Sequence, residues 1–252
     1  MISADLEGRT VLVTGASSGI GLTAAGTFAR NGARVAMNHL PDDPRGPQAV
    51  EMMRDEGYDA FSAPGDVSKP GDAEHMVEHA AAAMGRLDIL INNAGTANTV
   101  EPIPFEDLDA MTEEFWQRIL ATNLIGPFRC THAAAPYLKA ARGAVVSTAS
   151  IAGLGVRGSS IAYGASKAGL INLTRSLALA LAPEVRVNAV APGLVRTPWT
   201  APWPEERKQR SIGESMLERI VEPEDIAEAM LFLAVHPAIT GQTLAVDCGR
   251  KG

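Results

Sequence analysis

A tyrosine and a lysine lie one helical turn apart in the stretch "SSIAYGASKAGL", residues 159–170. Tyrosine is scarce, because Tyr163 is one of only three in the chain. A spacing of four places Tyr163 and Lys167 on one face of a helix, with their Cβ atoms about 6 Å apart. The residues between them, 164–166, are small. The arrangement leaves room for a flat ligand beside a phenol and an ammonium group.

The pair could perform acid–base chemistry if the lysine charge acts on the phenol. A free phenol titrates near pH 10, too high for a base at neutral pH. A cation about 4–6 Å away, at an effective dielectric constant near 20, favours the phenolate by a few kcal/mol, so the pKa of Tyr163 is expected to fall by roughly two units. That brings the phenol toward the range of efficient catalysis. The structural alternative is a half-buried tyrosine beside a lysine whose ammonium reaches solvent.

A glycine-rich turn, "VTGASSGIG" at 13–21, follows a predicted strand and opens a predicted helix. Gly15, Gly19 and Gly21 would allow a tight turn, close approach of a pyrophosphate, and tight packing of helix against strand. The N-terminus of the helix offers unpaired N–H groups and a partial positive charge to phosphates. The position between strand and helix favours a dinucleotide site over an ordinary turn.

The end of the second predicted strand bears on the choice of cofactor. Dinucleotide folds often carry a carboxylate there, which binds the ribose 2′-hydroxyl. This chain has Asn38 and His39 instead, and Arg45 follows. All three could donate hydrogen bonds to a 2′-phosphate, which favours NADP over NAD, although aspartates stand at 42–43. The alternative for His39 is a surface histidine that ends a strand.

Six segments together resemble the short-chain dehydrogenase/reductase family, over essentially the whole chain and in order. They are TGASSGIG (14–21), NNAG (92–95), Asn123 in "ATNLIG", Ser150, YGASK (163–167) and APG (191–193). Within the family the chain is most similar to the 3-oxoacyl-[acyl-carrier-protein] reductase-like group. The resemblance implies an NAD(P)-dependent oxidoreductase that moves a hydride between the nicotinamide and a secondary alcohol or ketone, such as a 3-oxoacyl thioester.

The resemblance assigns four catalytic residues. It implies that Tyr163 is the acid/base that protonates the carbonyl oxygen or deprotonates the alcohol. Lys167 would hold the nicotinamide ribose hydroxyls and lower the pKa of the tyrosine. Ser150 would bind the substrate oxygen, and Asn123 would steady a proton relay to the lysine.

The resemblance also implies a set of cofactor contacts at the ends of successive strands. Asp66 and Val67 resemble the adenine contact, and the segment from Asn92 to Gly95 resembles the strand end that lines the cofactor. The expected cofactor-binding residues are Gly15, Ser17, Ser18, Gly19, Ile20, Gly21, Asn38, His39, Asp66, Val67, Asn93, Ala94, Gly95, Tyr163, Lys167, Pro192, Gly193, Val195 and Thr197.

Seven short apolar runs alternate with helical patterns and must position these residues. We expect strands at 10–14, 33–38, 59–63, 87–92, 143–150, 184–190 and 243–247, and helices at 19–31, 48–56, 72–84, 113–139, 163–182 and 223–234. Parallel neighbours need crossover connections. The alternation therefore predicts an α/β fold: a Rossmann-like, doubly wound, seven-stranded parallel sheet with helices on both faces, in a single domain over 1–252.

Two long excursions, 96–111 and 197–215, interrupt this alternation. Ligands bind at the carboxyl ends of the strands in such sheets, so both are candidate walls of a site, with a substrate loop at about 195–220. Trp199 and Trp203 in the second excursion could form an apolar lid or could equally be subunit contacts.

Two features fall outside the family pattern. Cys248 stands where glycine is common, without an evident connection to function. The segment "HMVEH" at 75–79 fits the H-x-x-E-H pattern of zinc proteases, but it lies on a predicted crossover helix, away from the strand ends. We expect a solvated helix face there and no metal site.

Composition and charge exclude several classes of protein. The net charge is −7 and there is no basic block, which argues against a nucleic-acid or membrane partner. No apolar run approaches the roughly 20 residues of a membrane span. The acidic N-terminus does not resemble a signal peptide, and Cys130 and Cys248 are expected to be free thiols, so we expect a cytoplasmic protein.

A second functional class stays open beside the oxidoreductase. A non-catalytic nucleotide-binding sensor or scaffold could use the same fold, although the joint presence of the four catalytic residues favours an enzyme. The resemblance implies a homotetramer, with the helices at 113–139 and 163–182 in one interface. The substrate is left open among acyl thioesters, sugars, steroids and small diols.

Overall fold

The structure is a computed structural model that describes residues 2–251. Seven strands form one sheet in the order β3-β2-β1-β4-β5-β6-β7, with every neighbouring pair parallel. The strands are β1 (Thr10–Val13), β2 (Arg34–His39), β3 (Ala60–Pro64), β4 (Ile89–Asn92), β5 (Ala144–Thr148), β6 (Arg186–Pro192) and β7 (Thr243–Val246). The predicted doubly wound sheet is confirmed, and its direction of winding reverses between β1 and β4.

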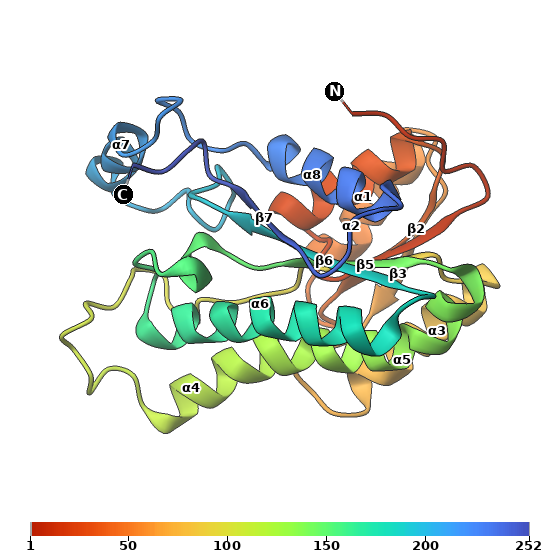
Figure 1. Cartoon of the computed structure of the whole chain (residues 1–252), viewed down its shortest axis with the longest axis horizontal. Coiled ribbons are helices and arrows are strands. Elements are labelled where there is room, and N and C mark those ends of the chain that lie inside the picture. Colours follow the sequence, from red (N-terminus) through yellow and green to blue (C-terminus); the bar gives the residue numbers. More distant parts are fainter. Residues whose placement is uncertain (1, 252) are drawn as a thin grey trace.

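Helices cover both faces of the sheet (Figure 1). One layer contains α1 (Gly19–Arg30), α2 (Arg45–Asp55) and α8 (Pro223–Val235), and the other contains α3 (Asp72–Met84), α5 (Gly126–Ala141) and α6 (Ile161–Leu181). The strands alternate between two cores, because successive side chains point to opposite faces. Val11 and Val13 pack in the core under α1 and α8, whereas Leu12 packs in the core under α3. Burial on both faces explains the continuous apolar runs in the sequence.

Three short helical elements differ from the sequence expectation. The predicted helix at 113–139 is α4 (Glu113–Leu120), a π-helical turn η1 (Ala121–Ile125) and then α5. A 3₁₀ turn, η2 (Ile151–Leu154), follows β5. The helix α7 (Glu205–Gly213) lies inside the second excursion and buries none of its residues, so its sequence shows no apolar face that would reveal it. None of the helices described for residues 2–251 is long and apolar enough to cross a membrane.

Candidate active site

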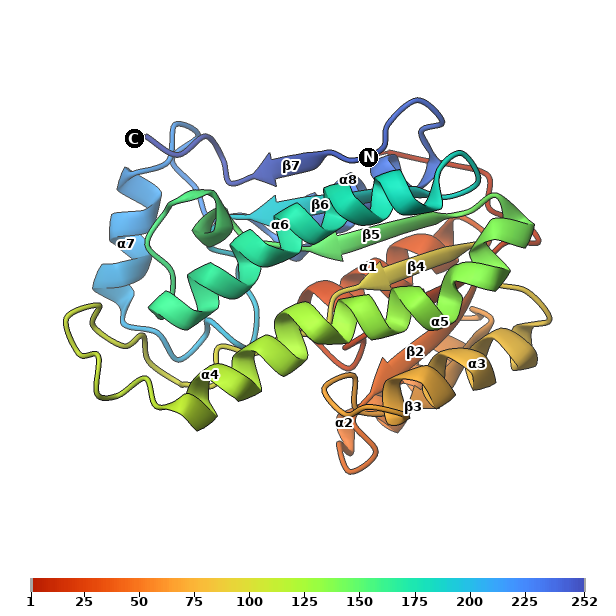
Figure 2. The ribbon, with the colours of Figure 1, turned by 60° about the horizontal axis from the view of Figure 1, so that its bottom comes forward.

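A cavity of about 1110 Å³ opens at the carboxyl ends of the strands. Its walls include residues that directly follow β1, β3, β4, β5 and β6. Figure 2 shows the arrowheads of β5, β6 and β7 pointing to the end of the sheet where α7 stands. The cavity thus spans the point where the strand order reverses, the place at which open α/β sheets bind ligands. All the predicted site residues line it except Gly21, Asn92 and Asn123.

The glycine turn after β1 is shaped for close approach of another group. Gly15 has φ +63°, and a Cβ added there would lie 2.9 Å from the Cα of Ala94. The hydroxyl of Thr14 accepts hydrogen bonds from the backbone N–H groups of Asn93 (2.9 Å) and Ala94 (3.0 Å), which joins the ends of β1 and β4. A Cβ at Gly21 would collide with the carbonyl oxygen of Gly15. Gly21 therefore packs α1 against the turn and does not line the cavity.

The N-terminus of α1 faces the cavity through Ser18, Gly19 and Ile20. The side chain of Ser18, at the N-cap position, makes no capping hydrogen bond. The first N–H groups of α1 thus lack a side-chain acceptor, and an anion can take that place. The tight glycine backbone and this helix end fit the pyrophosphate of a dinucleotide.

The side chains of Asn38 and His39 are engaged within the protein. Asn38 is 2% exposed; its Oδ1 accepts from the N–H of Gly15 (3.2 Å), and its Nδ2 donates to the carbonyls of Ala63 and Gly65. His39 is 4% exposed, with Nε2 2.6 Å from the Oγ of Ser62. These bonds correct the expectation that both side chains donate to a 2′-phosphate, because Asn38 instead fixes the glycine turn.

The charged groups at this end of the cavity are Asp43, Arg45 and Asp66. Arg45 donates to both carboxylate oxygens of Asp43 (2.8 and 2.9 Å), and this bond lowers the pKa of Asp43 to about 2. Asp43 also accepts from the hydroxyl of Ser17 in the glycine turn (3.0 Å). Asp66 lines the cavity, and its carboxylate accepts from the hydroxyl of Ser68 (2.6 Å). The guanidinium of Arg45 is therefore already paired with an acid.

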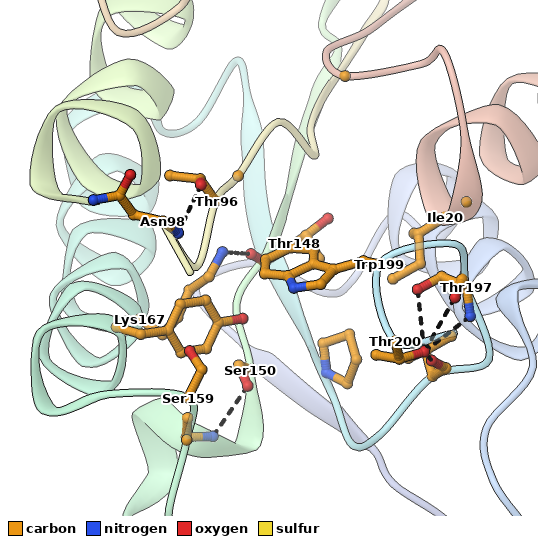
Figure 3. A pocket seen from close by; sticks show the side chains of 18 of the residues that line it. Ile20, Thr96, Asn98, Thr148, Ser150, Ser159, Lys167, Thr197, Trp199 and Thr200 are labelled. Carbon is orange, nitrogen blue, oxygen red and sulfur yellow. Dashed lines mark hydrogen bonds between the residues drawn. The ribbon is translucent and has the colours of Figure 1, made fainter. Parts of the chain in front are cut away.

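The opposite end of the cavity contains Ser150, Tyr163 and Lys167 (Figure 3). Lys167 is buried and its Nζ donates to the carbonyl of Thr148 (2.7 Å), at the end of β5. The Oγ of Ser150 accepts from the N–H of Ala152 (3.1 Å), so the serine's own hydrogen is free for another acceptor. Trp199 meets Tyr163 edge to face, with ring centroids 6.2 Å apart. This contact supports the lid interpretation of Trp199.

Burial, not the lysine charge, dominates the titration of the pair. Desolvation raises the pKa of Tyr163 to about 12, and only the neighbouring hydroxyl of Ser150 acts in the opposite direction. Desolvation also lowers the pKa of Lys167 to about 8. The Nζ of Lys167 lies 5.7 Å from the centre of the Tyr163 ring. The expected lowering of the tyrosine pKa is thus wrong for the protein alone, because loss of hydration outweighs the attraction between the two groups.

Asn123 positions the wall of the cavity without lining it. It is fully buried in η1; its Oδ1 accepts from the N–H of Thr96 (2.8 Å), and its Nδ2 donates to the carbonyl of Thr96 (2.9 Å) and to the hydroxyl of Ser166. A Cβ at Gly95 would lie 3.4 Å from the Oδ1 of Asn123 and 3.6 Å from the Nζ of Lys167. Asn123 therefore packs from behind against Gly95, which with Lys167 belongs to the cavity wall.

Asn92 does not belong to the cavity wall, contrary to the expectation for this segment. Its Nδ2 donates to the hydroxyl of Thr131 (3.0 Å) on α5, in the buried layer behind the sheet. The alternation of side chains along β4 places Asn92 on the opposite face from Asn93, which lines the cavity.

Several wall residues have no sequence motif and were missed. They come from the two excursions and from the segment before α6: Thr96, Asn98, Ile103, Arg157, Ser159, Arg207 and Arg210. The excursions themselves were expected to form walls, and they do. Which of their side chains face inward depends on loop conformation, as in the bond from the N–H of Ile103 to the carbonyl of Ser159 (2.8 Å).

Comparison with known proteins agrees with this site. Residues 15–251 match the family model described as "Enoyl-(Acyl carrier protein) reductase". A Streptomyces violaceoruber protein assigned as ketoacyl reductase 2 of granaticin polyketide synthase is 43% identical, with 96% of each chain covered. The cis-4-hydroxycyclohexanecarboxylate dehydrogenase of Sinomonas cyclohexanicum is 36% identical, again with 96% of each chain covered.

A solved structure shows the same architecture. The 7 alpha-hydroxysteroid dehydrogenase complexed with NADH and 7-oxo glycochenodeoxycholic acid superposes with a TM-score of 0.88 at 29% identity, covering 98% of this chain and 95% of that one. Full-length similarity, the glycine turn, and the grouping of Ser150, Tyr163 and Lys167 on one cavity lead to one conclusion. The chain belongs to the short-chain dehydrogenase/reductase family and is an NAD(P)-dependent oxidoreductase that acts on CH–OH groups.

Proposed function

We propose that the enzyme reduces a ketone with Tyr163 as proton donor and Ser150 as the residue that binds the carbonyl oxygen. The observation that carries this proposal is the grouping of Ser150, Tyr163 and Lys167 on the wall of one cavity, and the raised pKa of Tyr163 is consistent with a phenol that stays protonated at neutral pH. The Ser150 hydroxyl, whose oxygen already accepts from Ala152, directs its hydrogen to the same carbonyl oxygen. Protonation of that oxygen accompanies hydride addition to the carbon.

The bound nicotinamide cofactor supplies the hydride, and Lys167 supports the proton transfer. One N–H of Lys167 is used by the carbonyl of Thr148, which leaves two for hydroxyl groups in the cavity. The ammonium stabilises the phenolate that remains after Tyr163 gives up its proton. In the oxidation direction the same phenol must lose its proton first, so alcohol oxidation is expected to gain rate as the pH rises.

For the substrate, we infer a secondary alcohol or ketone such as a 3-oxoacyl thioester. Support comes from the relatives, which include a ketoacyl reductase and the 3-oxoacyl-[acyl-carrier-protein] reductase of Thermotoga maritima, 34% identical to this chain. We infer NADPH over NADH, because Arg45 is the cation at the adenosine end of the cavity and its side chain, although paired with Asp43, is 62% exposed and keeps further N–H groups for a 2′-phosphate. No relative supports the sensor or scaffold alternative.

We also infer a homotetramer in the cytoplasm. Exposed apolar side chains on the two helices named for an interface support the assembly: Ile125 and Phe128 lie in or beside α5, and Leu179 lies on α6. The two free cysteines suit a reducing compartment. Light scattering of the purified protein should give the mass of four chains.

The test is turnover with both cofactors across a panel of 3-oxoacyl thioesters and small ketones. Tyr163→Phe should keep cofactor affinity in a fluorescence titration and lose about 10²–10⁴-fold in kcat, because only the proton donor is removed. Tyr137→Phe, a half-buried tyrosine on α5 outside the cavity, is the matched control and should keep its rate. Equal rates for Tyr163→Phe and the parent enzyme would refute the proposed role.

A further inference from the structure

The wall of the cavity opposite the glycine turn contains several arginines. Arg207 and Arg210 lie one turn apart on α7, and Arg157 comes from the segment between η2 and α6. Figure 2 shows α7 at the carboxyl ends of the strands, and residues 102–104 of the loop after β4 line the same cavity. Arg157 lies six residues before Tyr163, next to the segment of Ser159 that contacts Ile103 of the first excursion. The three arginines thus belong to the substrate end of the cavity.

These positive charges are poorly neutralised within the described residues. Neither Arg207 nor Arg210 forms an ion pair or a side-chain hydrogen bond with any of residues 2–251. Arg207 is half-buried, with its guanidinium carbon 3.9 Å from the centre of the Trp203 ring. Arg157 reaches Glu106 at 3.5 Å, but that carboxylate is largely exposed. A half-buried guanidinium without an acid is costly, because its lost hydration is not replaced.

The lowered pKa of Arg207 reflects the same concentration of positive charge. Loss of hydration is the largest cause that lowers the pKa of Arg207, and the positive charges of Arg210 and Arg157 lower this pKa further. Arg210 and Arg157 are therefore both close enough to Arg207 to repel its charge. The chain as a whole carries a net charge of −7, so this local excess of positive charge is not a general property of the surface.

Two hydrogen-bond donors in the same wall also lack acceptors. The Nε1 of Trp203 and the hydroxyl of Ser159 are shielded from solvent and make no hydrogen bond within residues 2–251. Ser159 is 6% exposed, and Figure 3 shows it on the same side of the cavity as Ser150 and Lys167. Buried donors are normally satisfied, so their partner is expected to be a ligand with acceptor oxygens.

We propose that this wall binds an oxyanion carried by the substrate, a carboxylate or a phosphate, with Arg207 as its principal contact. The proposal rests on the proposed function, because it concerns the ketone or alcohol that Tyr163 acts on. The edge contact of Trp199 with Tyr163 and the stacking of Arg207 on Trp203 place both ends of the substrate along one segment, 197–215. A guanidinium binds two oxygens of either anion at once, which fixes the far end of the substrate.

The test uses three ketones that share one ring: 4-oxocyclohexanecarboxylate, its methyl ester and 4-oxocyclohexyl phosphate. We expect one of the two anionic ketones to be preferred over the ester, and the preferred one identifies the anion. Arg207→Gln should raise KM for that ketone about 10–100-fold, with little change in kcat and none in the KM of the ester. Arg207→Lys should restore part of the affinity. Lys139→Gln removes an exposed charge from α5, outside the cavity, and should change nothing.

A binding measurement separates this proposal from the proposed function. Calorimetry on Tyr163→Phe loaded with NADPH should show that the preferred anionic ketone binds, and that adding Arg207→Gln weakens it by the same factor. Absence of turnover with all ketones, together with this difference in binding, would sink the proposed function alone. Equal affinity for acid, phosphate and ester, or an equal effect of Arg207→Gln on all three, would overturn the anion site.

Discussion

Tyr163 and Lys167 share one desolvated site, and neither side chain titrates as it does in water. The tyrosine pKa of about 12 and the lysine pKa of about 8 both reflect the cost of burying a charge. At neutral pH the pair is a neutral phenol beside a lysine close to its own pKa. The phenol is thus set for proton donation, and the return of a proton from the lysine to the phenolate is favourable, because the pKa of Lys167 lies below that of Tyr163.

This burial predicts a pH dependence of stability that depends on Lys167. Between pH 8 and 10 the folded lysine holds fewer protons than the unfolded one, whose pKa is near 10.4, so the free energy of unfolding rises with pH. This contribution should be about 2 kcal/mol in urea denaturation, measured as the difference between the parent enzyme and Lys167→Met, because the opposite effect of the raised pKa of the buried Cys130 thiol is the same in both proteins. The raised pKa of Tyr163 acts only above pH 10, where it reverses the sign. Lys139→Met, an exposed lysine on α5, should follow the parent profile; parallel profiles for Lys167→Met and the parent enzyme would contradict the prediction.

The functional residues could be predicted from the sequence where the spacing between them determines their relative position in the structure. The spacing of four between Tyr163 and Lys167, and the glycines of the turn, are visible without coordinates. The roles of Asn38 and His39 could not be predicted, because a strand-end polar residue can face the ligand or the neighbouring strand. The arginines of α7 were also missed, since nothing in a polar helix indicates which of its charges lacks a partner.

At the scale of elements, the site depends on how η2 is packed against α6. η2 carries Ser150 at its N-cap, and α6 carries Tyr163 and Lys167. Gly153 allows the two to touch, because a Cβ there would lie 2.6 Å from the backbone carbon of Lys167. The glycine therefore sets the separation between the serine and the tyrosine.

Gly153→Ala should impair catalysis more than cofactor binding. The added methyl group must displace η2 from α6, at a cost of about 1–3 kcal/mol, and Ser150 moves with it. We expect a loss of kcat/KM of at least tenfold with unchanged NADPH affinity. Gly213→Ala, where a Cβ meets nothing within 4 Å, is the control for adding a methyl group. Full activity in Gly153→Ala would show that this packing does not position Ser150.

Helices and strands were predicted correctly where the sequence has apolar residues at regular spacing or in a continuous run. They were missed where the sequence has neither pattern. All seven strands were found, because each contains a short apolar run; burial on both faces explains the run in the inner strands, whereas β7 is an edge strand with no buried residue. The helix α7 buries no residue and left no pattern. The π-helical turn η1 is hidden in a longer helical pattern, since one altered hydrogen-bond register around Asn123 hardly changes which residues are apolar.

At the scale of the whole molecule, the sheet separates a stabilising end from a reactive end. Asp88, just before β4, is 2% exposed and accepts hydrogen bonds from Arg9, Arg86 and Thr10. Burial alone would raise its pKa, but these bonds hold the pKa of Asp88 below its ordinary value. The carboxylate joins the amino ends of β1 and β4. Asp88 and Asn93 are five residues apart along β4, so at about 3.3 Å per residue Asp88 lies roughly 16 Å from the cavity wall at Asn93.

Asp88→Ala should therefore lower stability without changing the chemistry. Loss of a buried carboxylate that satisfies several donors is expected to cost about 3 kcal/mol, or roughly 6–12 °C in Tm for a chain of this size. Asp59→Ala removes an exposed partner of Arg34 and should cost under about 1 kcal/mol. Below the unfolding range, kcat/KM of Asp88→Ala should equal that of the parent enzyme, because the carboxyl ends of the strands keep their positions. A fall of kcat/KM together with Tm would contradict this prediction. It would mean that β1 and β4 couple the two ends of the sheet, so that the position of the glycine turn depends on Asp88 as well as on its local contacts.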